Sequence, residues 1–119
     1  LMLLIMQITQ VLNKNMVDQT NNKQTIVLAL QTQRDLMTAK DIKIVKGNVF
    51  ITLFDEDIIS YKLRGNKVIR QVNNKGSETI LYNVEYINFE KINNVLQVKV
   101  KYEKSKKIYY QILGKEKFK

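Results

Sequence analysis

The apolar residues of this chain change their spacing once. Residues 1–46 contain no glycine, and Leu4, Ile8, Val11 and Leu12 recur at helical intervals. This pattern predicts an N-terminal helix over residues 1–46. Asn and Gln are frequent in the middle of this stretch, so a break or frayed turn is expected near residues 20–22.

A second apolar stretch lies in the later part of the predicted helix. Ile26, Leu30 and Met37 fall on one face and are expected to cover a sheet. Arg34 and Asp35 are expected to face water. The helix is therefore predicted to join the sheet through its aliphatic residues.

From residue 48 the apolar period becomes two, which is typical of strands. Gly65-Asn66 and Asn93-Asn94 are hairpin signals between such runs. Short connections require antiparallel neighbours, because a parallel pair needs a long crossover. The pattern predicts an α+β protein, with the long N-terminal helix on an antiparallel β-meander of about five or six strands, at residues 49–54, 58–63, 68–72, 79–89, 96–103 and 108–113.

The amino-acid composition limits the kinds of active site and metal site that this chain can form. A length of 119 residues fits one domain, in which residues 47–119 would form the sheet part. The chain has no Cys and no His, which excludes the common nucleophilic triads and the commonest transition-metal ligands. Its four glycines are isolated, so no phosphate-binding loop is present, and Asp55-Glu56-Asp57 is read as a hairpin turn. We expect no enzyme activity, no cofactor and no metal.

The formal charge of +9 is concentrated near the C-terminus, where eight lysines from Lys99 onward face only two acidic residues. Such a tail can bind nucleic acid, anionic lipid or a cell-wall polyanion, or it can be a solvated lysine-rich face. Only three of the basic residues are Arg, which argues against sequence-specific reading of DNA. The candidate polyanion contacts are Lys99, Lys101, Lys106, Lys107 and Tyr109.

Tyrosines alternate with lysines in the same region. Alternation along the strands places three tyrosines on the same side as the apolar residues: Tyr82, Tyr86 and Tyr102. These tyrosines are therefore expected in the core. Tyr109 and Tyr110 are adjacent, so one of the two must face outward from a strand. This pair is the best aromatic candidate for a contact with a partner.

The chain opens with six consecutive apolar residues, Leu1 to Met6. A membrane-spanning helix needs about 20, so this segment alone cannot span. It is either the start of a helix that packs on the domain or the trailing end of a longer hydrophobic helix. The second interpretation is favoured, because the chain begins with Leu rather than Met.

Three stretches resemble a known family. They are Leu30-Gln31-Thr32-Gln33-Arg34-Asp35-Leu36-Met37-Thr38-Ala39, then Ile59-Ser60-Tyr61-Lys62-Leu63 with Val68-Ile69-Arg70-Gln71-Val72, and Gly76-Ser77-Glu78-Thr79-Ile80-Leu81-Tyr82-Asn83-Val84. Their order, with the two closing strands, resembles the ComGF-type minor pseudopilins of Gram-positive competence operons, which are type IV pilin-like proteins. The resemblance covers roughly residues 24 to 113. The cleavage site of that family and the acidic residue that begins its mature helix are not in this sequence.

The resemblance implies a pilin-like fold without an active site. It implies a single-pass subunit in the plasma membrane, with the sheet domain outside on the cell surface. Its partners would be the other minor and major pseudopilins of the operon, and it would help assemble or cap the fibre that takes up transforming DNA, with direct DNA contact left open. The residues implied for assembly are Leu3, Leu4, Ile5, Ile8, Val11 and Leu12. The alternative is a soluble basic binding module that contacts nucleic acid or another polyanion.

Overall fold

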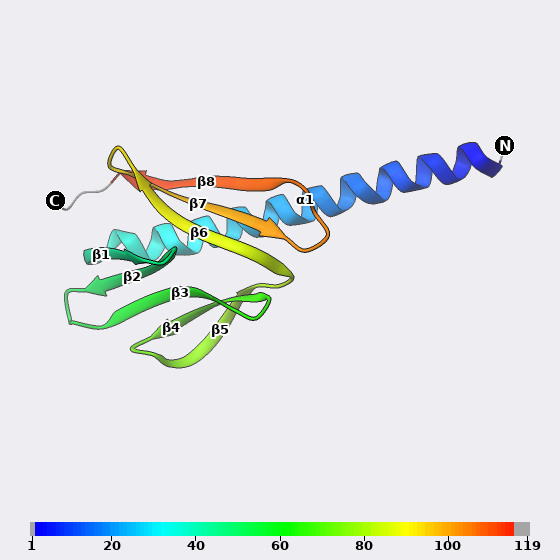
Figure 1. Ribbon diagram of the computed structural model, residues 1–119. Coiled ribbons are helices and arrows are strands. Elements are labelled where there is room, and N and C mark those ends of the chain that lie inside the picture. Colours follow the sequence, from blue (N-terminus) through cyan, green and yellow to red (C-terminus); the bar gives the residue numbers. More distant parts are fainter. Residues whose placement is uncertain (1, 116–119) are drawn as a thin grey trace.

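The computed structural model describes the backbone of residues 2–115 and the side chains of residues 16–114. One helix is followed by eight strands in the described chain (Figure 1). The elements are α1 (Met2–Met37), β1 (Ala39–Val45), β2 (Asn48–Leu53), β3 (Ile58–Arg64), β4 (Lys67–Val72), β5 (Lys75–Leu81), β6 (Val84–Ile92), β7 (Val95–Tyr102) and β8 (Ile108–Lys115). The predicted α+β class is confirmed.

The helix is continuous, so the break expected near residues 20–22 is wrong. No Gly or Pro interrupts residues 2–37. The polar stretch stays helical because part of it packs on the strands: Asn21 is buried, and the Tyr109 hydroxyl of β8 donates to Asp18. Tertiary contact thus stabilises a segment whose composition suggests fraying.

The predicted end of the helix at residue 46 is also wrong, because α1 ends at Met37 and residues 39–45 form β1. Ile42, Ile44 and Val45 are β-branched and favour a strand. Lys46 and Gly47 both have positive φ, at 52° and 78°, which gives the two-residue turn that joins β1 to β2. Lys40, Lys43 and Lys46, which would suit the last turn of a helix, therefore belong to a hairpin.

The strands form two sheets rather than one meander of five or six strands. The first has the order β1-β2-β3-β4-β5 and the second has β6-β7-β8, with every pair antiparallel. The single strand expected over residues 79–89 is divided at Asn83, where φ is 57°. The left-handed backbone of this non-glycine residue turns the chain, which leaves the first sheet at the end of β5 and begins the second at β6.

The β1–β2 turn joins the two sheets. The Phe89 amide donates to the Gly47 carbonyl at 2.9 Å, and a Cβ on Gly47 would lie 2.6 Å from Asn88 Oδ1. At the other end of β6, the Val84 amide donates to the Asn66 carbonyl at 2.8 Å. Glycine is needed at position 47 for both its backbone angle and this close approach.

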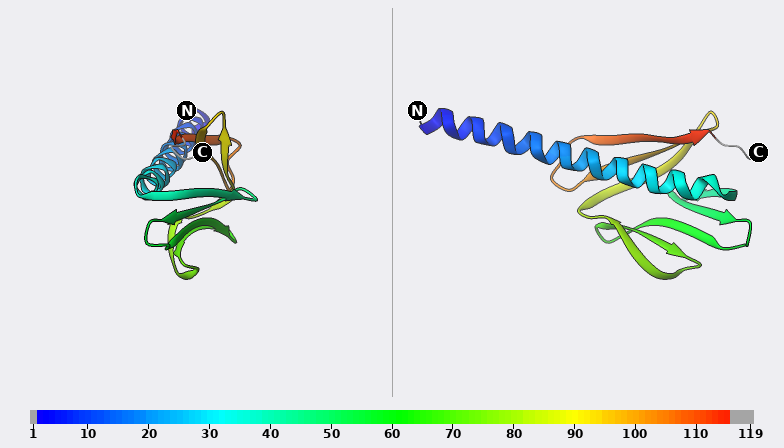
Figure 2. Two further views of the ribbon diagram at one scale, coloured as in Figure 1. Left: turned by 90° about the vertical axis from the view of Figure 1, so that its left-hand side faces the viewer. Right: turned by 180° about the vertical axis from the view of Figure 1, so that it is seen from behind.

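Helix α1 lies mainly along β8, while its N-terminal part projects beyond both sheets (Figures 1 and 2). The molecule is accordingly elongated, with extents of 64 × 32 × 22 Å. The core lies between the helix and the sheets and includes Leu28, Tyr61, Phe89 and Tyr102, which are at most 2% exposed. Across the part of the chain that the structure describes, no helix combines the length and apolarity that crossing a membrane requires.

Candidate assembly surface

The outer face of α1 is the main apolar surface of the described helix. Met16, Val27, Leu30 and Met37 are 57–80% exposed and follow one another at helical intervals. We call these four residues the outer stripe; Lys23 and Arg34 lie in the same row. The expectation that Leu30 and Met37 cover the sheet is therefore wrong, and Ile26 is likewise 37% exposed.

The face of α1 that does pack on the sheets is built differently. Leu28 and Ala29 are its buried aliphatic residues, and Thr25 and Thr32 are completely buried beside them. The Thr32 hydroxyl donates to the Leu28 carbonyl at 2.8 Å, and the Thr25 hydroxyl shares a hydrogen bond of 2.8 Å with Tyr102 Oη. Small and self-satisfied side chains let the helix approach the strands closely.

Asp35 forms the centre of a buried polar cluster, although it was expected to face water. It is 7% exposed, and Arg70 binds it through two nitrogens, Nε to Oδ2 at 3.0 Å and the terminal Nη2 to Oδ1 at 3.1 Å. The Tyr61 hydroxyl donates to the same Oδ2. This two-point geometry is the strongest form of a carboxylate–guanidinium pair.

The sheet register explains why these three residues meet. Tyr61 on β3 pairs directly with Arg70 on β4, so their side chains point to the same face beneath the end of α1. We call Asp35, Tyr61 and Arg70 the helix clasp. Each comes from one of the short stretches on which the family resemblance rests. The sequence pattern alone did not predict that these three residues form one site.

The clasp perturbs the titration of its members. Burial, and then the hydrogen bond to Asp35, raises the pKa of Tyr61 well above its ordinary value. The hydrogen bonds to Asp35 raise the pKa of Arg70 further. Arg70 therefore stays charged and the Tyr61 hydroxyl keeps its proton, so both groups can donate hydrogen bonds to Asp35.

A second polar contact holds α1 nearer to its projecting part. The Tyr109 hydroxyl donates to Asp18, whose carboxylate also lies 3.3 Å from Lys107 Nζ. The Tyr109 hydrogen bond is the main cause that lowers the pKa of Asp18. Tyr109 also packs edge-on against Tyr102, with ring centroids 5.5 Å apart.

The predicted polyanion residues do not form one site. Tyr109 is 4% exposed and points inward, so its assignment as a surface contact is wrong: the alternation of β8 places Tyr110 outside instead, at 55%. Lys99 lies on the outer face of β7, 3.0 Å from Glu90, and its Nζ is 5.6 Å from the Tyr110 ring centroid. Lys101 pairs with Glu85, while Lys106 and Lys107 lie in the β7–β8 loop.

The core assignment of the other tyrosines is only partly right. Tyr102 is buried, whereas Tyr82 and Tyr86 are 55% and 45% exposed. Tyr82 follows the end of β5 beside Asn83, where the chain turns, and an irregularity in the β6–β7 pairing between Val84 and Tyr86 changes the parity of β6. The sequence pattern revealed neither. The residues proposed for assembly, Leu3, Leu4, Ile5, Ile8, Val11 and Leu12, lie on α1, but their side chains are outside the described residues.

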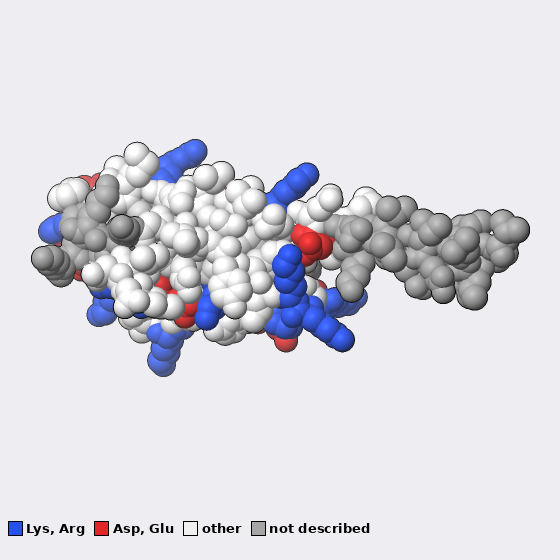
Figure 3. Space-filling view, turned by 90° about the horizontal axis from the view of Figure 1, so that it is seen from above, with Lys and Arg blue, Asp and Glu red and all other residues white. Residues whose placement is uncertain are grey.

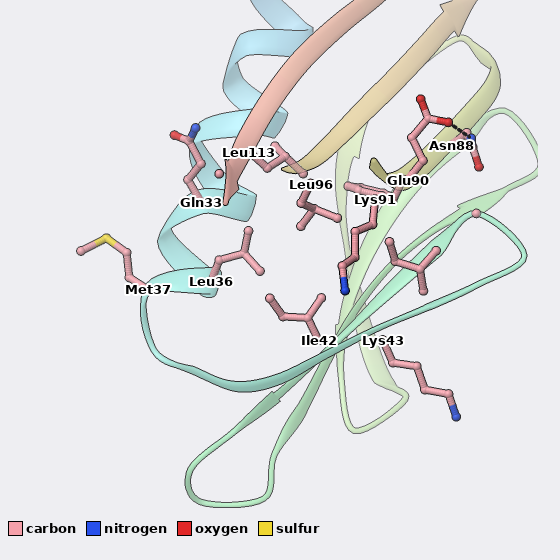
Figure 4. Close-up of a pocket in the computed structure, with 14 residues that line it drawn as sticks. Gln33, Leu36, Met37, Ile42, Lys43, Asn88, Glu90, Lys91, Leu96 and Leu113 are labelled. Carbon is pink, nitrogen blue, oxygen red and sulfur yellow. Dashed lines mark hydrogen bonds between the residues drawn. The ribbon is translucent and has the colours of Figure 1, made fainter. Parts of the chain in front are cut away.

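A groove of about 740 Å³ lies where the end of α1 meets β1 and the second sheet (Figure 4). Leu36, Ile42, Leu96 and Leu113 line it, and Lys43 and Glu90 stand near its rim. The groove can receive an apolar side chain. Among the described residues there is no cluster of acidic side chains that could hold a metal ion.

These features define an α+β domain carried on a projecting helix with an exposed apolar stripe. The family model of the competence protein ComGF matches residues 9–109, which is most of the chain and includes all three clasp residues. The chain belongs to the ComGF family, as the resemblance in its sequence predicted. No curated protein and no solved structure matched the chain in the other two comparisons.

Proposed function

We propose that this protein is a minor pseudopilin of a competence pilus, which helps assemble or cap the fibre used for uptake of transforming DNA in a Gram-positive bacterium. Membership of a competence family supports the process. The observation that carries the structural role is α1, a single helix that projects from the sheets and exposes the outer stripe. We propose no catalytic role.

The outer stripe is suited to packing against neighbouring helices. A soluble domain that buried all its helix contacts internally would direct Val27, Leu30 and Met37 inward, but here they are exposed while Thr25, Thr32 and Asp35 are buried. Apolar residues at these intervals are what a helix offers to a partner helix. The partners would be the other minor and major pseudopilins of the same operon.

The location that goes with this role is the plasma membrane and cell surface. The apolar opening of α1 would continue the anchor of a single-pass subunit, with the sheets outside. Reading the codons immediately upstream of Leu1 tests this. An in-frame apolar stretch of about a dozen residues after a short basic leader is expected; an in-frame stop codon there would contradict the anchor.

Assembly is tested with a double variant of the stripe, Val27→Glu with Leu30→Glu, in a transformable strain that expresses the protein from its own operon. We expect the transformation frequency, and the recovery of pseudopilins with the tagged protein, to fall by roughly 30-fold or more. Phe54→Glu is the matched control, because Phe54 is 70% exposed in the β2–β3 turn, away from α1. Wild-type transformation by a stably folded stripe variant would refute the proposed role of the stripe.

A further inference from the structure

The end of the domain from which α1 projects carries a cluster of basic side chains. Arg64 and Lys67 flank the β3–β4 turn, and Lys104, Lys106 and Lys107 belong to the β7–β8 loop. We call these five residues the basic end. All five are exposed. Figure 3 shows basic side chains gathered where the helix leaves the sheets, next to an acidic group.

The contacts of the turns hold this cluster together. Asn66 donates to Glu103 at 3.4 Å, and the Glu103 amide donates to the Asn83 carbonyl at 2.8 Å. A shallow hollow between α1 and the β7–β8 loop is lined by Asp18, Lys104, Lys106 and other residues of that loop. The β3–β4 turn, the β5–β6 turn and the β7–β8 loop therefore form one surface around the helix.

The charge of this surface is only partly neutralised. Asp18 is engaged by Lys107 and Tyr109, and Lys67 lies 5.6 Å from the Tyr82 ring centroid. No acidic partner lies in salt-bridge range of Arg64, Lys104 or Lys106 among the described residues. The opposite end differs, because its β2–β3 turn carries Asp55, Glu56 and Asp57.

We propose that the basic end docks on the anionic headgroups of the membrane that α1 enters. This rests on the proposed function, since it requires the N-terminal side of α1 to lead into a bilayer. The turns that carry this surface lie at the end of the sheets from which α1 projects, to one side of the helix (Figure 1), so the surface faces that bilayer. Lysines, as compact point charges, suit headgroup phosphates without selecting a sequence.

The length of the helix permits this contact. The first charged residue of the chain is Lys14, so the hydrocarbon boundary falls between Met6 and Leu12, where apolar residues give way to polar ones. At about 1.5 Å per residue, Asp18 then lies about 9–18 Å from the hydrocarbon. The headgroup layer fills about 6 Å of this distance, and the Debye length at physiological salt is about 8 Å.

The test is binding of the full chain to vesicles of phosphatidylcholine alone and of phosphatidylcholine with phosphatidylglycerol, at low and high salt. We expect binding to require the anionic lipid and to weaken with salt. The triple variant Arg64→Gln, Lys104→Gln, Lys106→Gln should weaken it by about 100-fold, since each basic residue near an anionic surface contributes about fivefold. The matched control is Lys43→Gln, Lys46→Gln, Lys75→Gln, which removes the same charge elsewhere and should weaken binding by less than about threefold.

Three results would overturn the proposal. Equal loss in the two triple variants would mean that only the net charge matters. Binding that does not depend on phosphatidylglycerol would exclude the headgroup contact. Tighter salt-dependent binding of duplex DNA, lost in the same triple variant, would assign the surface to nucleic acid. The vesicle assay measures lipid docking without a fibre, and the transformation assay with the stripe variants measures assembly without added lipid. Failure of lipid docking can therefore be told apart from failure of the pseudopilin role.

Discussion

The two faces of α1 reverse the usual distribution of polarity. The inner face, which packs on the sheets, holds Thr25, Thr32 and Asp35, and the outer face holds Leu30 and Met37. In most surface helices the apolar face is the inner one. The difference teaches that this helix is fastened to its own domain by specific polar contacts together with Leu28 and Ala29, while the aliphatic residues of the outer stripe stay exposed.

The largest expected effect comes from breaking the helix clasp. Asp35→Ala would leave Arg70 and the Tyr61 hydroxyl without their shared acceptor at a buried site. We expect the free energy of unfolding to fall by about 3–5 kcal/mol, measured by urea denaturation. Arg34→Ala is the control on the exposed side and should change it by less than about 0.5 kcal/mol. Equal losses of stability in Asp35→Ala and Arg34→Ala would show that the helix clasp does not hold α1 to the sheets.

Two leucines on opposite faces give the sharpest direct comparison. Leu28 is fully buried, whereas Leu30 is 60% exposed. Leu28→Ala is expected to lower the free energy of unfolding by about 2–5 kcal/mol, because it opens a cavity in the core. Leu30→Ala should change it by less than about 0.5 kcal/mol in the same denaturation assay. A large loss at Leu30 would place the outer stripe in the core of the isolated domain.

A smaller effect is expected at Thr25. Thr25→Val keeps the shape of the side chain but leaves the buried Tyr102 hydroxyl without its 2.8 Å partner. The expected loss is about 1–2 kcal/mol. Thr20→Val, on the exposed side of the same helix, serves as the control and should be nearly neutral. If both variants unfold alike, the Thr25–Tyr102 contact does not contribute to stability.

The smallest predicted effect is a loss of stability in alkali. Burial raises the pKa of Tyr102 to about 12, above the ordinary value of 10.0. Between these values the unfolded chain has released the proton and the folded chain still holds it, so stability is full below about pH 10 and falls as pH rises toward 12. Urea midpoints at pH 8, 10 and 11 check this. Tyr102→Phe should make the decline less steep, with the rest coming from Tyr61, whose pKa is also raised, and Tyr110→Phe, at an exposed position, should leave it unchanged.

Much of the architecture followed from local pattern. Helical periodicity without Gly predicted the long helix, although not its continuity or its end at Met37, and Asn93-Asn94 predicted a tight turn, where both residues have positive φ. β1 was missed because its lysines also suit a helix end, although the alternation of Ile42 and Ile44 was a usable signal. The division at Asn83 was missed because a single residue with positive φ leaves little trace in the periodicity.

The candidate sites were less predictable than the elements. Lys99 and Lys101 were correctly expected on the solvent side of their strand, yet each is paired with a glutamate of β6. Glu85 and Glu90 lie beyond the β6–β7 turn, and only the β6–β7 register, which places Tyr86 opposite Lys101 and Asn88 opposite Lys99, brings them within reach of the lysines. The basic end is likewise assembled from turns that are far apart in the sequence.

The sequence by itself determined the element types, the antiparallel hairpins and the family, because these depend on periodicity, turn residues and order along the chain. Only the tertiary structure decided which face of α1 is buried. Burial of Asp35 is favourable solely because Tyr61 and Arg70, 26 and 35 residues away, provide the donors that replace water. No local pattern carries that information, so the sequence did not predict that Asp35 faces inward while Leu30 and Met37 stay exposed.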